Sequence, residues 1–176
     1  MPPEVSYLAD ANIDDALDEE LRGLLTQCFT KPQDVIFQTQ RYFKEPYADR
    51  WVIRDTSGSL RAHVGVHRKQ VETRTAQFRI GGICEVCVHP DFRGRGYVRE
   101  MLRGIHAWQV SQGLTFSVLF GNPQVYGSSG YREKTNLLYQ PEGGGWEGAE
   151  PLSALVCPVT ETPWPEEPVF LFGPKF

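Results

Sequence analysis

The segment Arg93-Gly94-Arg95-Gly96 combines residue types suited to binding an anion. Its glycines allow a ligand to approach the backbone closely, and its guanidinium groups could add positive charge. A helix-period pattern follows directly, and the first N–H groups of a helix have no partner within the helix. We therefore expect a bound phosphate group at the start of that helix.

A second candidate for chemistry, Glu85, stands in the apolar run Ile83–Val88. An ionisable side chain in such a run is unfavourable unless it is paired, hydrated or used in a reaction. Glu85 could therefore act as a base, directly or through a water molecule. A salt bridge on a hydrated face of the sheet is the alternative.

The spacing of the cysteines and histidines argues against a metal site or a redox site. Cys84 and Cys87 are three residues apart on an expected strand, so they should point to opposite faces about 10 Å apart. That separation is too large for a disulfide or a shared zinc ion, and we interpret both as core residues. His63 and His67 share one face of an expected strand, and without a third ligand we interpret them as surface residues.

The elements that position these residues can be predicted from periodicity. A strand is expected at Val5–Leu8, followed by an amphipathic helix with an acidic start and one apolar stripe, formed by Leu17, Leu21, Leu24, Leu25 and Cys28. The irregular, aromatic segment 31–50 predicts a short helix and a loop. Four further strands are expected near residues 51–54, 60–72, 77–80 and 83–88, the first two joined as a hairpin.

The second half of the chain alternates between helix and strand patterns. The helix after Gly96 should bury Val98, Met101, Leu102, Ile105 and Trp108. The apolar strand Leu114–Phe120 follows it and should run parallel to the strand before the helix. Asn122 and Pro123 predict the start of a short helix. Strands are then expected at 131–139, 152–157 and 169–172.

Composition narrows the class of protein. The chain has 176 residues, 40% of them hydrophobic, and a net charge of −4. This length predicts a single domain over residues 1–176. The acidic balance argues against a nucleic-acid partner, and the lack of a signal peptide or a long apolar run argues against membrane association. We expect a cytoplasmic protein with a small-molecule partner, and a homodimer is compatible with the sequence.

The order of motifs resembles that of the GNAT superfamily of acetyl-CoA-dependent N-acetyltransferases over roughly residues 50–140. The residues that carry the resemblance are Val88, Pro90, Arg93, Gly94, Gly96, Tyr126 and Gly130. The family's pyrophosphate signature is matched at Arg93 and Gly96, but Val98 stands where the family has glycine or alanine. The resemblance implies a mixed α/β fold, whose largely antiparallel sheet contains a splayed parallel strand pair and is flanked by helices.

The resemblance also implies a set of site residues. Coenzyme A would be contacted by Val86, Val88, Arg93, Gly94, Arg95, Gly96, Tyr97, Val98 and Asn122. Tyr126 falls where family members protonate the departing thiolate, although its ring could instead pack a short helix onto the sheet. Glu85 is similar in position to the strand glutamates that serve as bases in many members of the family. Acetyl-CoA is the implied co-substrate, and no metal is implied.

The implied activity is direct acetyl transfer to a primary amine of a small molecule. The acidic helix near the N-terminus and the aromatic segment 37–47 would suit a cationic acceptor. Two alternatives remain open. The tail faintly resembles NodA-type acyltransferases, which would imply a longer acyl chain, and the protein could be a non-catalytic module that binds acyl-CoA. A peptide or protein acceptor is also compatible with this fold.

Overall fold

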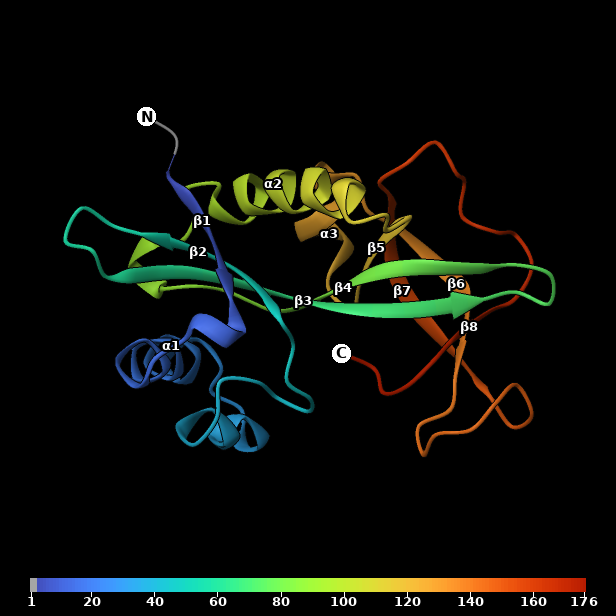
Figure 1. Cartoon of the computed structure of the whole chain (residues 1–176), viewed down its shortest axis with the longest axis horizontal. Coiled ribbons are helices and arrows are strands. Elements are labelled where there is room, and N and C mark those ends of the chain that lie inside the picture. Colours follow the sequence, from blue (N-terminus) through green and yellow to red (C-terminus); the bar gives the residue numbers. More distant parts are fainter. Residues whose placement is uncertain (1–2) are drawn as a thin grey trace. The chain divides into compact units, whose positions relative to one another are not determined.

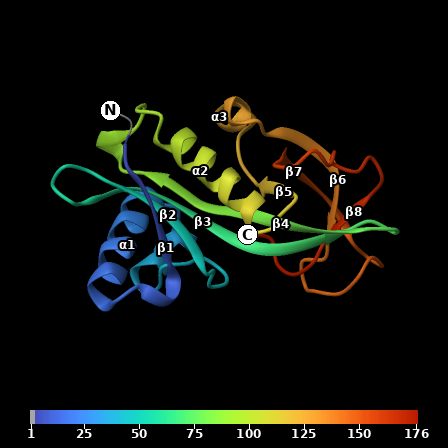
Figure 2. The ribbon, with the colours of Figure 1, turned by 45° about the horizontal axis from the view of Figure 1, so that its top comes forward.

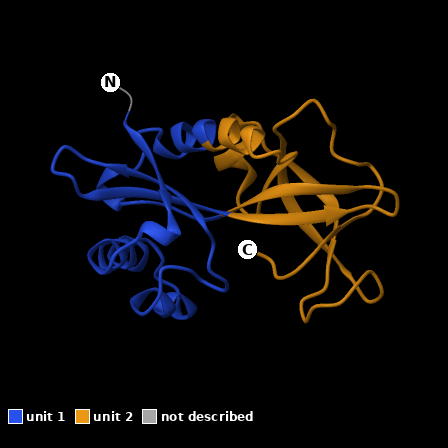
Figure 3. Ribbon diagram, viewed as in Figure 1, with its two compact units in different colours: residues 1–66, 84–104 blue, residues 67–83, 105–176 orange. Residues whose placement is uncertain are grey.

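The computed structural model describes residues 3–176 and divides the chain into two compact units (Figure 3). The first unit contains the described residues up to Val66 together with Cys84–Gly104, and the second contains His67–Ile83 and Ile105–Phe176. Three elements begin in one unit and end in the other: β3 (Leu60–Glu72), β4 (Gln77–Val88) and α2 (Tyr97–Ser111).

The first unit contains strands in the order β1 (Val5–Ala9), β2 (Asp49–Arg54), β3 and β4. β1 pairs antiparallel with β2, and β2 pairs antiparallel with β3. A hairpin turn joins β2 to β3, as the sequence predicts. β4 is the last strand in this order, so one edge of its residues 84–88 is not paired with any described strand of the first unit.

The helix α1 (Asp15–Cys28) packs against these strands through its apolar stripe. Asp14 caps the helix, because its Oδ1 accepts a hydrogen bond from Leu17 N over 2.9 Å. Leu21, Leu24 and Leu25 are buried against a core that includes Phe37 and Val52. Within the first unit, α1 and the start of α2 lie on opposite sides of the strands (Figures 1 and 2). The predicted amphipathic helix is confirmed.

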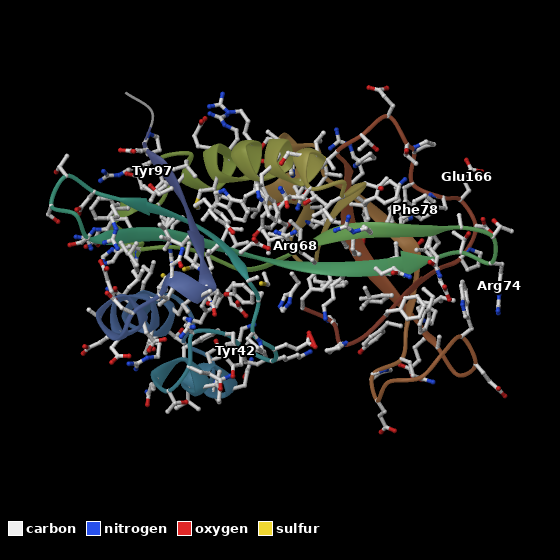
Figure 4. The ribbon with its side chains drawn as sticks, viewed as in Figure 1. Tyr42, Arg68, Arg74, Phe78, Tyr97 and Glu166 are labelled. Carbon is white, nitrogen blue, oxygen red and sulfur yellow. The ribbon has the colours of Figure 1, made fainter. Side chains whose placement is uncertain are left out.

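Short 3₁₀ turns connect the elements of the first unit. They are η1 (Asp10–Asn12), η2 (Pro32–Gln38) and η3 (Pro90–Phe92). η2 is the short helix expected in the aromatic segment, and Tyr42 lies in the loop that follows it (Figure 4). Phe37 of η2 is only 2% exposed, so this part of the segment is core rather than open surface.

The second unit contains a ring of six paired strands. Their order is β3, β4, β5 (Phe116–Leu119), β7 (Glu150–Pro158), β6 (Arg132–Tyr139) and β8 (Val169–Leu171). β4 and β5 are parallel with Ile80 opposite Phe116, as the crossover predicts. β8 runs parallel to β6 and also pairs antiparallel with β3, which completes the ring. This closure was not expected from the sequence, although the mixed α/β class is confirmed.

A buried cluster of mainly aliphatic side chains, with two aromatic rings, forms the core of the second unit. Phe116 packs edge-on against Trp164 at a centroid distance of 5.0 Å, and both belong to one buried cluster with Val169. The short helix α3 (Pro123–Tyr126) and the turn η4 (Gly127–Ser129) follow β5 in the chain. No helix within residues 3–176 combines the length and the apolar character that crossing a membrane requires.

Candidate functional site

The arginine/glycine segment forms the loop that leads into α2. Gly94 and Gly96 have φ angles of 74° and 77°, which residues with a side chain rarely adopt. A Cβ built on Gly94 would meet nothing within 4 Å, so the backbone there is open to a ligand. The first helical bond runs from Glu100 N to Gly96 O, which leaves the N–H groups of residues 97–99 without a partner in the helix. The loop therefore fits a phosphate group.

The two loop arginines are tied to the loop itself. Arg93 Nε donates to Val88 O over 3.2 Å, and Arg95 Nη2 donates to Asp91 O over 3.2 Å. The Arg95 guanidinium also lies 4.5 Å from the centroid of the Phe92 ring. Both residues are exposed, so their remaining N–H groups are accessible to solvent. Tyr97 and Val98 begin α2 and are partly buried; Tyr97 is marked in Figure 4.

Val86 and Val88 lie on the part of β4 that forms the edge of the first unit. Both are partly buried, and the strand ends at Val88, immediately before the loop. An unpaired edge offers backbone N–H and C=O groups to an extended ligand such as the pantetheine arm of coenzyme A. The strand and the loop are thus joined as the sequence predicts.

Glu85 has an unusual backbone and a buried carboxylate. Its φ angle is 43°, the only positive value of a non-glycine residue among the described residues. Oε1 accepts a hydrogen bond from Phe43 N over 3.0 Å, whereas Oε2 is buried and has no hydrogen-bond partner among the described residues. Burial raises the pKa of Glu85, and contacts with Tyr47, Phe43 and other neighbours offset this only in part. A carboxylate held in this way is a stronger base than an exposed one.

A buried network surrounds the backbone of Glu85. The carbonyl oxygen of Glu85 lies 2.8 Å from His63 Nδ1, and His63 Nε2 lies 3.1 Å from Arg50 Nη1. Arg50 Nη1 also donates to the Tyr47 hydroxyl over 2.8 Å, and Arg50 Nε donates to Asp10 Oδ1 over 3.0 Å. Burial and the charge of Arg50 lower the pKa of His63 to about 3, so this histidine is neutral at physiological pH.

The surface interpretation of His63 and His67 is wrong. His63 is 0% exposed and His67 is 8% exposed. In the first unit, Tyr47 covers this face of β3: a Cβ on Gly65 would lie 2.4 Å from Tyr47 Cε2. The covering residues are distant in sequence, and sequence reasoning missed them. The sequence did contain one sign of a buried polar network here. Arg50 is an ionisable residue next to the apolar run 51–53, so the argument used for Glu85 also applies to Arg50.

Tyr126 and Asn122 belong to the second unit. Asn122 caps α3, because its Oδ1 accepts from Gln124 N over 2.9 Å. Tyr126 is the last residue of α3 and is partly buried, with its ring edge-on to Tyr131 at a centroid distance of 6.0 Å. Because the side-chain oxygen of Asn122 accepts the capping hydrogen bond, the group that Asn122 can still offer to a ligand is its side-chain NH₂, a donor. The predicted short helix is confirmed, and the roles of both residues stay predictions.

All four cysteines are free thiols, and the sequence did not predict that two of them lie close together. Cys28, at the end of α1, lies close to the Cys87 thiol and to the Arg93 guanidinium. The Cys87 contact and Arg93 lower the pKa of Cys28, whereas burial raises that of Cys84. Among the described residues, no three histidine, cysteine or acidic side chains are grouped as a metal site would need.

Comparison with known proteins identifies the family. A sequence model of the acetyltransferase (GNAT) domain matches residues 9–133, and no curated protein sequence matches the chain. The faint similarity of the tail to NodA lies beyond the matched residues and has no support there.

Solved structures with the same fold include enzymes bound to coenzyme A. A GNAT family N-acetyltransferase (YhbS) from Escherichia coli, in complex with CoA, has a TM-score of 0.62 at 15% identity, over 92% of this chain and 84% of that chain. An acetyltransferase from Brucella melitensis, in complex with acetyl-CoA, has a TM-score of 0.55 at 18% identity, over 74% and 84%.

A third similar structure belongs to a longer protein. It is a probable N-acyltransferase from Enterococcus faecalis, with a TM-score of 0.61 at 17% identity, over 77% of this chain but only 33% of that chain. These likenesses show the fold, and the domain match covers well over half of the sequence. The chain therefore belongs to the GNAT acetyltransferase family.

Proposed function

We propose that this chain transfers an acetyl group from acetyl-CoA to a primary amine of a small molecule, by direct transfer in a ternary complex. The observation that carries the proposal is the junction of β4, the glycine loop and α2 in a GNAT chain. A strand with an open edge leads there into a loop with two glycines of positive φ and then into the unpaired amides of a helix start. This sequence of elements suits an extended thiol arm followed by a pyrophosphate.

The substrate acetyl-CoA would supply the acetyl group as an activated thioester. The backbone amides of Arg93–Val98 would hold its pyrophosphate, with Arg95 and Arg93 adding charge from the exposed side of the loop. Val86 and Val88 would hydrogen-bond to its pantetheine arm through their backbones. Asn122 would contribute its side-chain NH₂, since its oxygen already caps α3.

Glu85 is the proposed base for the acceptor. An amine must lose a proton before it can attack a thioester, and at neutral pH most primary amines are protonated. The raised pKa of Glu85 brings the carboxylate closer to the amine in basicity, and Oε2 has no competing donor among the described residues. Proton transfer to this oxygen could be direct or through a water molecule.

Tyr126 is the proposed acid for the leaving group. Its phenol would donate a proton to the sulfur of coenzyme A as the thioester bond breaks. The ring is only partly buried and stands at the end of α3, next to the turn η4. The ring packs edge-on against Tyr131, which limits the directions that the phenol can take.

The preference for a cationic acceptor has less support than the sequence suggested. Asp18 is paired with Arg22 and Arg41, and Asp10 is paired with Arg41 and Arg50. These carboxylates are already neutralised. The support for an amine acceptor therefore rests on Glu85 rather than on the acidic residues of the N-terminal region.

The test is release of free thiol from acetyl-CoA across a panel of amines, aminoglycosides, polyamines, amino acids and peptides. We expect turnover with at least one small primary amine, and acetyl-CoA should raise the melting temperature where adenosine does not. Binding without thiol release on any amine would favour the non-catalytic module. Turnover with palmitoyl-CoA in preference to acetyl-CoA would favour the longer-chain alternative.

A further inference from the structure

The backbone of Glu85 adopts a conformation that its sequence does not favour. A φ of 43° places Cβ close to the neighbouring backbone, and glycine is the residue that normally occupies this region. Glu85 also stands inside a strand, where the surrounding φ values are negative. Such a conformation persists only when neighbouring groups hold it, and it redirects the side chain relative to an ordinary strand residue.

His63 is the neighbour that contacts this backbone directly. The guanidinium of Arg50 can only donate hydrogen bonds, so His63 Nε2, 3.1 Å from Arg50 Nη1, must be the acceptor. The single proton of the neutral ring is therefore on Nδ1. This N–H points at the carbonyl oxygen of Glu85, 2.8 Å away, and donates to it.

Arg50 fixes the arrangement from the other side. It is 0% exposed, and its Nε is held by Asp10 Oδ1 over 3.0 Å. Its Nη1 donates both to His63 and to the Tyr47 hydroxyl. Because that nitrogen donates to the Tyr47 oxygen, the proton of Tyr47 is left to point elsewhere, and the Glu85 carboxylate is close enough to add to the effect of burial in raising the pKa of Tyr47. One guanidinium thus contacts two side chains, of which His63 holds the backbone of Glu85 and Tyr47 lies near its carboxylate.

We infer that His63, oriented by Arg50, is a positioning residue that keeps the strained backbone of Glu85, and hence its carboxylate, in the geometry needed for proton transfer. The inference rests on the proposed function for its catalytic consequence, but its structural part does not. His63 does not touch the reacting atoms in this assignment. Its effect passes through one hydrogen bond to a main-chain carbonyl.

The structural part can be tested without any turnover. The ¹⁵N signals of the four histidines can be recorded on labelled protein, and His63 identified by its loss in a His63→Asn variant. We expect a neutral ring with the proton on Nδ1, unchanged between about pH 5 and pH 8. A proton on Nε2, or titration in this range, would overturn the inference whatever the activity of the protein.

The catalytic part can be tested with a matched pair of variants. His63→Leu keeps the volume but removes the donor, whereas the side-chain NH₂ of His63→Asn can occupy nearly the position of Nδ1–H. We expect His63→Leu to lower kcat by about 10- to 100-fold, because small misplacements of a catalytic group have effects of this size. KM for acetyl-CoA should stay within about twofold, and His63→Asn should recover most of kcat.

The pH profile separates positioning from general loss of structure. The charged and titratable groups around Glu85 are Tyr47, Cys84, Cys87, Arg50 and His63, and the amide of Phe43 also contacts it. In His63→Leu the apparent pKa of kcat should move towards the ordinary glutamate value, as the carboxylate becomes hydrated. Wild-type kcat and an unchanged profile in His63→Leu would overturn the inference.

Two failures remain distinguishable. If the wild-type protein releases no thiol with any amine, the proposed function fails while the tautomer measurement still decides whether His63 holds Glu85. If His63→Leu does not fold, the comparison of His63→Asn with His63→Gln replaces it, since the longer glutamine places its donor beyond the Nδ1 position. Equal activity of these two variants would count against the inference.

Discussion

The ring of Tyr126 lies against the backbone of Gly121, so closely that a Cβ at Gly121 would come within 2.8 Å of Tyr126 Cε2. Both residues belong to the second unit, at the two ends of the turn and helix that follow β5. Glycine is thus required at position 121 to leave room for the ring. This contact gives Tyr126 one orientation, which a proton donor needs.

Removing the phenol should separate catalysis from binding. We expect Tyr126→Phe to lower kcat by about 100-fold with little change in the affinity for acetyl-CoA, because the ring remains and only the hydroxyl group that donates the proton is lost. Gly121→Ala should lower kcat too, by displacing the ring. Steady-state kinetics measures kcat, and calorimetry measures the affinity for acetyl-CoA.

Tyr131→Phe is the control. Tyr131 is buried and forms hydrogen bonds with Ser117 and His106, so this variant should lose stability rather than kcat. Full activity of Tyr126→Phe would contradict the donor role.

We expect the charge of Glu85 to be needed for activity but to lower the stability of the fold. Its folded-state pKa is raised, so the buried carboxylate is unfavourable at neutral pH and the protonated form is favoured as pH falls. Glu85→Gln keeps an oxygen for Phe43 N and removes the charge. We expect kcat to fall by about 100-fold or more while the melting temperature at pH 8 stays equal or rises. Thermal unfolding at pH 8 and pH 5 measures this, and a lower melting temperature at pH 8 would argue that the carboxylate is stabilised by its surroundings.

The glycine loop offers a matched pair of strained positions. Gly96 and Gly58 have φ angles of 77° and 83°, but Gly58 lies in the turn between β2 and β3. Alanine at either position should cost about 1 kcal/mol of stability through strain. Only Gly96→Ala should weaken acetyl-CoA binding, by about tenfold, because the loop backbone can no longer approach the pyrophosphate. Calorimetry on both variants decides this; equal affinities would place the cofactor elsewhere.

Cys28 should be the most reactive thiol of the protein. It is half-buried and its pKa is lowered by the Cys87 contact and by Arg93, whereas burial raises the pKa of Cys157. We expect iodoacetamide to label Cys28 first, and mass spectrometry of the peptides to show it. Acetyl-CoA should slow the labelling if the cofactor engages Arg93. A Cys28→Ser variant provides the control, and preferential labelling of Cys84 would contradict the assignment.

Two buried histidines predict acid sensitivity in a defined range. Burial lowers the pKa of His63 to about 3, with help from Arg50, and that of His106 to about 4. Unfolded histidine binds a proton below about pH 6.5, so the unfolding free energy should decrease as pH falls from about 6.5 to about 4. Each histidine contributes up to about 1.4 kcal/mol per pH unit. Urea unfolding at several pH values measures the slope, which should decrease by about half in His106→Asn.

Helices, caps and strand directions of this chain can be predicted from short stretches of its sequence. The stripe of α1, its acidic start, the cap at Asn122 and the parallel pairing of β5 all depend on residues close in sequence or on a general rule of handedness. The glycine loop before α2 was predicted for the same reason. These are features that a reader of one sequence can derive.

The environment of Glu85 could not be derived in this way. Nothing in the local sequence shows that Tyr47 covers Gly65 or that a non-glycine residue takes a positive φ. Each depends on contacts between segments more than ten residues apart. The contact of Cys28 with Cys87 and the pairing of β8 with β3 were missed for the same reason.

The way in which the chain passes between the two units has a consequence for how the protein folds. The first unit needs residues 84–104 for its last strand and the start of α2, and these follow a stretch that belongs to the second unit. During synthesis, therefore, the residues up to Val66 cannot complete their unit until Gly104 has left the ribosome. Long sequence separations of this kind slow folding, so the nascent N-terminal half should depend on chaperones more than a contiguous domain of the same size.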